Sequence, residues 1–199
     1  MQRLLCTDTG ENKEEQLGLG WQVAEAGLVA CVIDLRGHGE HSLLLDGEAG
    51  ADLDAAIRFC RLFGKVAAIG HSFGGHLSLL SNADYRIALS PSVNRSLSEH
   101  TQVMLKAKRS YRVRPSDFAV VLAIHEKLPI WDPTHDIENT LILFAEWDIP
   151  EISSGCNELK NVGARVVQIP KSMHSDIFLV EQTFMDVRNQ ILEWYGNGE

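Results

Sequence analysis

One segment of the chain combines residue types and spacing that suit nucleophilic catalysis. Gly70-His71-Ser72-Phe73-Gly74-Gly75 follows a short apolar run at 65–69 and precedes a helix-like stretch at 76–80. This order predicts that Ser72 lies on a sharp turn between a buried strand and a helix, where the flanking glycines avoid steric clashes. Its hydroxyl would then point off the end of the sheet. Since Gly-x-Ser-x-Gly also occurs in ordinary turns, the interpretation depends on the rest of the chain.

A serine hydroxyl is a weak nucleophile, so it needs a base for its proton and an acid that orients the base. Asp148 follows one predicted strand, and His174 follows the last predicted strand. The order Ser72, Asp148, His174 is expected when the three groups come from successive strands of one parallel sheet. Glu146 is the alternative acid. Asp176 is a weaker candidate, which we expect to cap the last helix.

The reaction also needs amide donors that stabilise the negative oxygen of the tetrahedral intermediate. We expect one donor to be the backbone N–H of Phe73. The second is expected in the loop after the first predicted strand, at Thr9, with Asp8 as the alternative. His71 is expected to pack within the turn around the serine rather than to titrate in the reaction.

Strand-like and helix-like segments alternate along the chain, which predicts a mostly parallel sheet of about six strands with helices on both faces. The expected strands are 3–6, 28–33, 65–69, 85–89, 140–145 and 164–169, and the expected helices are 13–26, 52–63, 151–161 and 176–195. We interpret the whole chain, 1–199, as one α/β domain. The segment at about 94–139 interrupts the alternation, and we interpret it as a small inserted helical cap. Its apolar residues are expected to line a substrate pocket: Phe118, Val120, Val121, Leu122 and Trp131.

The composition narrows the range of partners. The chain has 199 residues and a formal net charge of −9, which disfavours nucleic acids and anionic membranes as partners. No apolar run approaches the length of a membrane span. The four cysteines show no metal-like pairing, and His38 and His41 lack a third ligand nearby, so we expect no metal or cofactor. Cysteines in apolar runs favour a reduced, cytoplasmic setting.

These features together resemble the α/β-hydrolase superfamily. The matching segments are Trp21 to Gly27, Val32-Ile33-Asp34-Leu35-Arg36-Gly37-His38-Gly39, the glycine-rich turn around Ser72, the strand before Asp148, and Met173-His174. The resemblance implies a Ser-His-Asp hydrolase with Ser72, His174 and Asp148 in those roles. Similar proteins act on carboxylic esters, thioesters or, in some cases, peptide bonds.

The sequence departs from the family pattern at two places. Thr7-Asp8 occupies the position where relatives commonly carry His-Gly, so a carboxylate is expected beside the oxyanion donors. Relatives also usually begin with an extra pair of strands, which this chain lacks. The strand Leu28–Ile33 is therefore expected to form an edge of the sheet, and an exposed apolar edge favours a homodimer.

The sequence thus predicts a serine hydrolase that cleaves a small carboxylic ester or thioester through an acyl-enzyme on Ser72. Two alternatives remain open from the residues alone. A catalytically silent member of the superfamily would use the same scaffold for binding. A peptidase or acyltransferase would use the same three residues, because a fold does not determine its substrate.

Overall fold

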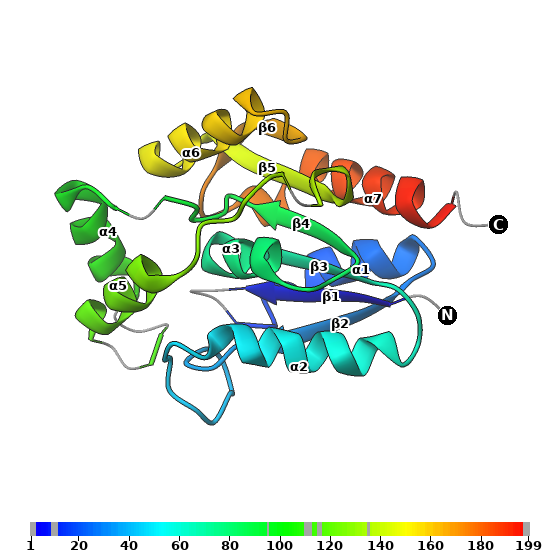
Figure 1. Cartoon of the computed structure of the whole chain (residues 1–199), viewed down its shortest axis with the longest axis horizontal. Helices are drawn as coiled ribbons and strands as arrows, with labels where there is room; N and C mark the ends of the chain where they lie inside the picture. Colours follow the sequence, from blue (N-terminus) through cyan, green and yellow to red (C-terminus); the bar gives the residue numbers. More distant parts are fainter. Residues whose placement is uncertain are drawn as a thin grey trace.

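Six parallel strands form one sheet in the order β2-β1-β3-β4-β5-β6 (Figure 1). The computed structural model describes residues 3–8, 12–94, 96–109, 113–114, 117–134 and 136–196. The strands are β1 (Arg3–Asp8), β2 (Val29–Asp34), β3 (Val66–His71), β4 (Tyr85–Leu89), β5 (Thr140–Trp147) and β6 (Val166–Met173). Every neighbouring pair is parallel, which confirms the predicted α/β fold with a parallel sheet.

Helices cover both faces of this sheet (Figure 1). They are α1 (Leu17–Glu25), α2 (Ala49–Arg61), α3 (Ser72–Leu80), α6 (Pro150–Asn161) and α7 (Glu181–Gly196), with a short 3-10 helix, η2 (Ile177–Leu179), before α7. Successive strand side chains point to opposite faces, so a strand covered on both sides must be apolar throughout. All six residues of β3 are buried accordingly.

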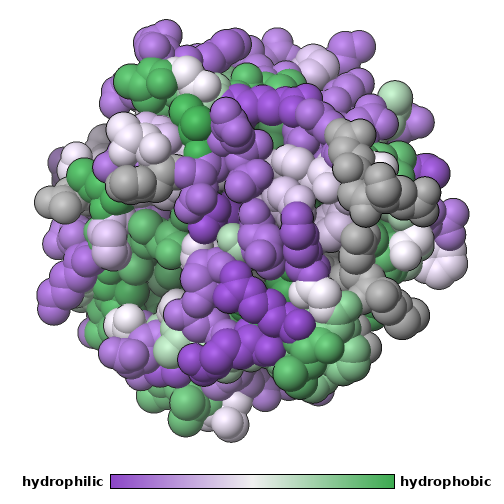
Figure 2. All heavy atoms as spheres, turned by 45° about the vertical axis from the view of Figure 1, so that its right-hand side comes forward, coloured by the Kyte–Doolittle hydropathy of each residue, from purple (hydrophilic) through white to green (hydrophobic). Residues whose placement is uncertain are grey.

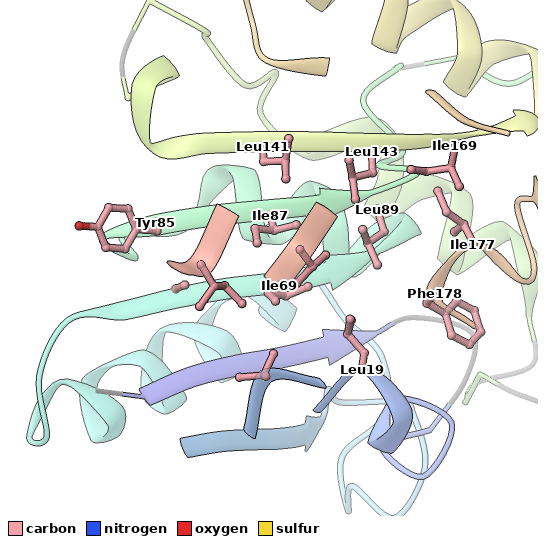
Figure 3. Close-up of a cluster of buried hydrophobic side chains, with 14 of the residues drawn as sticks. Leu19, Ile69, Tyr85, Ile87, Leu89, Leu141, Leu143, Ile169, Ile177 and Phe178 are labelled. Atoms are coloured by element: carbon pink, nitrogen blue, oxygen red, sulfur yellow. The ribbon is translucent and has the colours of Figure 1, made fainter. Parts of the chain in front are cut away.

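The alternation divides the core into two layers. In β3, Ala67 and Ile69 belong to the cluster under α1 and α7, whereas Val66 and Ala68 pack on the side of α2. Figure 3 shows the first layer, where Leu19 and Phe178 from the helical side meet side chains of the central strands. Burial of these apolar groups is the main force that holds the strand ends, and hence the loops beyond them, in fixed positions.

Several of the expected elements differ from the observed ones. The helix expected at 176–195 is divided into η2 and α7, and the last strand, expected at 164–169, extends to Met173. The helix expected at 13–26 begins later, and its buried side carries Leu19 and Val23, while Leu17 and Trp21 are exposed. The three- and four-residue spacing of Leu17, Trp21 and Ala24 predicts that these residues form the buried face of the helix. That prediction was wrong, because all three are exposed. β1 also extends to Asp8, so Thr7 and Asp8 lie in the strand rather than in a turn.

The segment between β4 and β5 carries two further helices, α4 (Glu99–Arg109) and α5 (Phe118–Lys127), and the 3-10 helix η1 (Ile137–Asn139). Figure 1 shows α4 and α5 beside the end of the sheet toward which the strand arrows point. In parallel sheets that end carries the functional loops. The two helices are thus placed next to the residues that the sequence singles out for chemistry.

A buried carboxylate closes the loop after β2. Asp34 accepts hydrogen bonds from the backbone N–H groups of Lys13 and Glu40, at 2.8 and 3.0 Å. Gly39 has a φ of +44°, and a Cβ atom there would lie 2.3 Å from Asp34 Oδ1. The Asp-x-Arg-Gly-His-Gly sequence is therefore explained by local structure, because both the acid and the last glycine are needed to form this loop.

β2 lies at one edge of the sheet, as predicted.

The face of the molecule shown in Figure 2 is mostly hydrophilic, with smaller hydrophobic groups between the polar residues. No helix in the described ranges is both long and apolar enough to cross a membrane.

Candidate active site

Ser72 lies at the junction of β3 and α3 in a strained backbone conformation. Its φ is +55°, in the left-handed region that non-glycine residues rarely adopt. A Cβ atom on Gly70 would lie 2.2 Å from the carbonyl oxygen of Gly74, so only glycine fits on the strand side of the turn. The turn therefore forces strand and helix together and leaves the serine at the end of the sheet.

The structure brings Ser72, His174 and Asp148 into one hydrogen-bonded chain. The serine hydroxyl lies 3.2 Å from His174 Nε2, within reach for donating its proton. On the other side of the ring, His174 Nδ1 lies 2.8 Å from Asp148 Oδ1. The carboxylate is fully buried and the imidazole is 19 % exposed. When Nδ1 donates to the carboxylate, the lone pair of Nε2 can accept the serine proton.

Asp148 is held in its ionised form by several donors. It also accepts hydrogen bonds from Ser90 Oγ and from the backbone N–H groups of Ala145 and Ile149. Burial opposes ionisation, but the hydrogen bonds from His174, Ser90 and Ala145 outweigh it and hold the pKa of Asp148 below its usual range. Ser90 was not among the residues predicted from the sequence. Its position at the end of β4, one strand from β5, is the signal that could have found it.

His71, the residue before the nucleophile, contacts the loop that carries His174. Its Nε2 donates to the backbone carbonyl of His174 at 2.8 Å, and the centroids of the two rings are 4.8 Å apart. The His71 ring also packs against Phe178, with a centroid separation of 5.1 Å. His71 thus packs at the turn, as expected, and in addition ties the turn to a residue 103 positions later.

The two alternative acids have other partners. Glu146 is exposed and accepts a hydrogen bond from the backbone N–H of Lys171 at 2.6 Å. Asp176 accepts from the backbone N–H of Met173 at 2.7 Å and precedes η2. Both carboxylates therefore shape the loop around His174, while Asp148 is the one that contacts the ring.

The expected oxyanion donors are only partly placed. Phe73 is the second residue of α3, so its backbone N–H lies at the open N-terminus of that helix, beside Ser72. Thr9, the expected second donor, lies outside the described residues. Asp8, the alternative, is the last residue of β1 and pairs in register with Asp34 of β2.

A small apolar pocket opens next to Ser72. Its walls come from the turn, from the cap and from α6: Ser72, Phe73, Ser92, Leu97, Leu105, Phe118, Val121, Leu122, His125, Ile149 and Ile152. Phe118, Val121 and Leu122 thus line the pocket as expected. Trp131 instead lines a separate groove beside α6, and Val120 is exposed. Within the described ranges, no three histidine, cysteine, aspartate or glutamate side chains gather to hold a metal ion.

Comparison with known proteins places the chain in a family. The model of the family described as "Alpha/beta hydrolase family" matches residues 17–177. No curated protein matches the sequence. Solved structures show the same fold at low sequence identity.

One similar structure is a thermophilic esterase from Thermogutta terrifontis, with 16 % identity, a TM-score of 0.66, and coverage of 99 % of this chain and 90 % of the other. Another is a monoacylglycerol lipase from Paleococcus ferrophilus, with 18 % identity, a TM-score of 0.64, and coverage of 96 % and 92 %. A third is an esterase from a marine microorganism, with 15 % identity, a TM-score of 0.69, and coverage of 97 % and 95 %.

The family match spans the turn around Ser72 and both loops that carry Asp148 and His174. The strand order and the helices on both faces agree with it. The chain therefore belongs to the alpha/beta hydrolase family of hydrolytic enzymes.

Proposed function

We propose that the protein is a serine hydrolase that cleaves a small carboxylic ester or thioester through an acyl-enzyme on Ser72. The observation that supports this most strongly is the hydrogen-bonded chain from Ser72 Oγ through His174 to the buried Asp148. The relatives named esterase and lipase are consistent with ester cleavage on this scaffold.

In this mechanism His174 Nε2 takes the proton of Ser72 while Oγ attacks the carbonyl carbon. The C=O double bond becomes a C–O single bond, and the N–H of Phe73 stabilises the resulting negative oxygen. Thr9 is proposed as the second donor. The intermediate collapses when His174 gives its proton to the leaving oxygen or sulfur, which releases the alcohol or thiol. Water then attacks the acyl-enzyme with the same base, which frees the carboxylic acid and restores Ser72.

Asp148 acts through His174. Its negative charge lies beside Nδ1–H of His174 and stabilises the imidazolium that forms during each proton transfer. Since its pKa lies below the usual range of carboxylic acids, Asp148 stays ionised wherever His174 can act as a base. We propose no metal and no cofactor for this reaction, no nucleic acid or membrane as a partner, and a reduced cytoplasmic setting for the protein.

Turnover of p-nitrophenyl acetate by the wild-type protein, Ser72→Ala and His174→Ala tests the proposal. We expect hydrolysis by the wild type and a loss of about a thousandfold or more in either variant, because each removes one member of the proton-transfer chain. Circular dichroism spectra that match the wild type show that both variants are folded. Equal rates for the wild type and Ser72→Ala would contradict the proposal.

A further inference from the structure

Two pockets meet beside the hydrogen-bonded chain and share part of their walls. The first is the apolar pocket that contains Ser72 and Phe73. The second contains Asp148 and His174 together with side chains of α4 and the loops after β5 and β6. Leu105 from α4 and Ile149 line both pockets, so they separate the two spaces.

The chemistry of the proposed reaction assigns one half of the substrate to each pocket. The acyl carbon must lie against Ser72 Oγ, with its oxygen toward the N–H of Phe73. The leaving oxygen must lie against His174, because that ring returns the proton. The pocket with Ser72 and Phe73 therefore takes the acyl chain. The pocket with His174 takes the alcohol.

The two spaces differ strongly in size. The first cavity has a volume of about 40 Å³, and the second about 290 Å³. At roughly 10–15 Å³ for each water-sized group, the first holds an acyl chain of about two to four carbons. By the same measure the second accommodates an alcohol as large as a fused aromatic ring with a short linker. The asymmetry favours a small acid esterified to a large alcohol.

The wall of the second pocket indicates the chemistry of that alcohol. Trp147 of β5 and Met173 of β6 are paired across the strands, and both are about half exposed, at 61 % and 49 %. Met104 of α4, 40 % exposed, faces the same pocket. Aromatic and thioether side chains favour flat hydrophobic ligands. None of the described lining residues is lysine or arginine, which disfavours a phosphorylated leaving group such as coenzyme A.

We propose that the natural substrate class is a short-chain carboxylic ester of a bulky, neutral, hydrophobic alcohol. This inference rests on the proposed serine hydrolase function and adds the orientation and the size of each substrate half. Trp147, Met173 and Met104 bind the alcohol, and the cap residues Phe118 and Leu122 limit the acyl chain.

Three esters with similar alcohol pKa values separate orientation from reactivity: ethyl acetate, 2-(2-naphthyl)ethyl acetate and ethyl 2-naphthylacetate. We expect kcat/KM for naphthylethyl acetate to exceed that for ethyl acetate by about tenfold or more, mainly through KM. Ethyl naphthylacetate, with the bulky group on the acid, is expected to be the poorest substrate. Acetyl-coenzyme A should be hydrolysed less efficiently than naphthylethyl acetate.

Two variants and a matched control locate the effect. Trp147→Ala should lower kcat/KM for naphthylethyl acetate about tenfold more than for ethyl acetate, whereas Leu122→Ala should raise the relative rate on hexanoyl esters. Trp21→Ala is the control, because Trp21 is similarly exposed, at 65 %, but lies on α1, away from both pockets. It should leave all substrate ratios unchanged.

Each outcome bears on a different claim. A preference for ethyl naphthylacetate or acetyl-coenzyme A, or equal effects of the Trp147 and Trp21 variants on the ratios, would overturn this assignment while leaving the serine hydrolase intact. No turnover of any ester, together with no covalent label on Ser72 from a fluorophosphonate, would overturn the proposed function as well.

Discussion

At the scale of single residues, the site separates into groups that the sequence could reveal and groups that it could not. Ser72, Asp148 and His174 each follow a predicted strand, and parallel strands bring their carboxyl ends to one edge. The structure places these three within hydrogen-bond distance. Ser90 bonds to Asp148, 58 residues away, and His71 bonds to His174, 103 residues away. No local sequence pattern indicates such partners.

Asp148→Asn tests the orienting role of the carboxylate. Its oxygen accepts the Nδ1 proton of His174, and an amide nitrogen there would favour the wrong tautomer of the ring. We expect kcat to fall by up to about ten-thousandfold in the ester assay.

Glu146→Gln is the control for that experiment, because its carboxylate bonds to Lys171 rather than to His174. It should retain nearly full activity. If Asp148→Asn kept the wild-type rate and Glu146→Gln lost it, Glu146 would be the orienting acid instead.

His71 tests how tightly the His174 loop must be held. His71→Phe keeps a ring beside His174 but removes the donor to its carbonyl oxygen. We expect kcat to fall by up to about a hundredfold with little change in KM, since small displacements of a catalytic group are costly. His71→Gln, which restores an N–H donor, should recover much of the lost kcat. Equal kcat values for His71→Phe and His71→Gln would argue against this role.

At the scale of elements, the ends and the buried faces of helices and strands depend on packing that the sequence alone does not reveal. In α2 the spacing of Leu53, Ile57 and Cys60 predicts one apolar side, and all three residues are buried. In α1 the apolar residues surround the helix, so spacing alone chose Leu17 and Trp21 incorrectly. β6 extended to Met173 beyond Pro170, since side-by-side pairing with β5 outweighs the local preference for a loop.

The Glu151 carboxylate of α6 forms hydrogen bonds at the start of the cap helix α4. Glu151 accepts hydrogen bonds from the N–H of Ser98 at 2.6 Å and from Thr101 Oγ1 at 2.9 Å. Glu151→Gln should loosen α4, so that hydrogen exchange of residues 99–107 accelerates by about tenfold or more. Glu193→Gln, which breaks an exposed ion pair with Arg165, is the matched control. Equal exchange in both variants would mean that α4 is held by other contacts.

His76 links α3 to the cap and makes this attachment sensitive to acid. Its Nε2 donates to the carbonyl of Pro129 at 3.0 Å, and burial lowers the pKa of His76 from 6.5 to about 4. Between these values the unfolded chain binds a proton that the folded protein does not, so stability falls as pH decreases through this window.

The expected loss from this group is about 2 kcal/mol between pH 7 and pH 5. Urea unfolding of the wild type and His76→Gln at both pH values measures it. The glutamine keeps a donor but does not titrate, so its stability should depend less on pH by about that amount. Identical pH dependence in both proteins would show that His76 is not the cause.

At the scale of the whole molecule, alternation of strands and helices was enough to predict the fold class. The placement of β2 at the sheet edge was predicted from the resemblance to the α/β-hydrolase superfamily, and the strand order agrees with it. The sequence located the cap only as a segment that interrupts the alternation. It did not show what the cap helices pack against, because their contacts lie elsewhere in the chain. The sheet brings these helices to the site, because it fixes the position where β4 ends and the cap segment begins.

The edge position of β2 carries the proposal of a homodimer. Among the described residues β2 pairs only with β1, and such a strand edge offers backbone donors and acceptors to a second copy of the strand. Light scattering coupled to size-exclusion chromatography should therefore give twice the mass of one chain at micromolar concentration. A single-chain mass over the whole concentration range would contradict pairing through β2.

An activated Ser72 should react covalently with a fluorophosphonate, and intact-protein mass spectrometry after such treatment measures this reaction. We expect one phosphonyl adduct in the folded wild type, mapped to Ser72 by peptide sequencing and absent in Ser72→Ala. A folded wild-type protein that acquires no adduct at Ser72 would contradict this expectation.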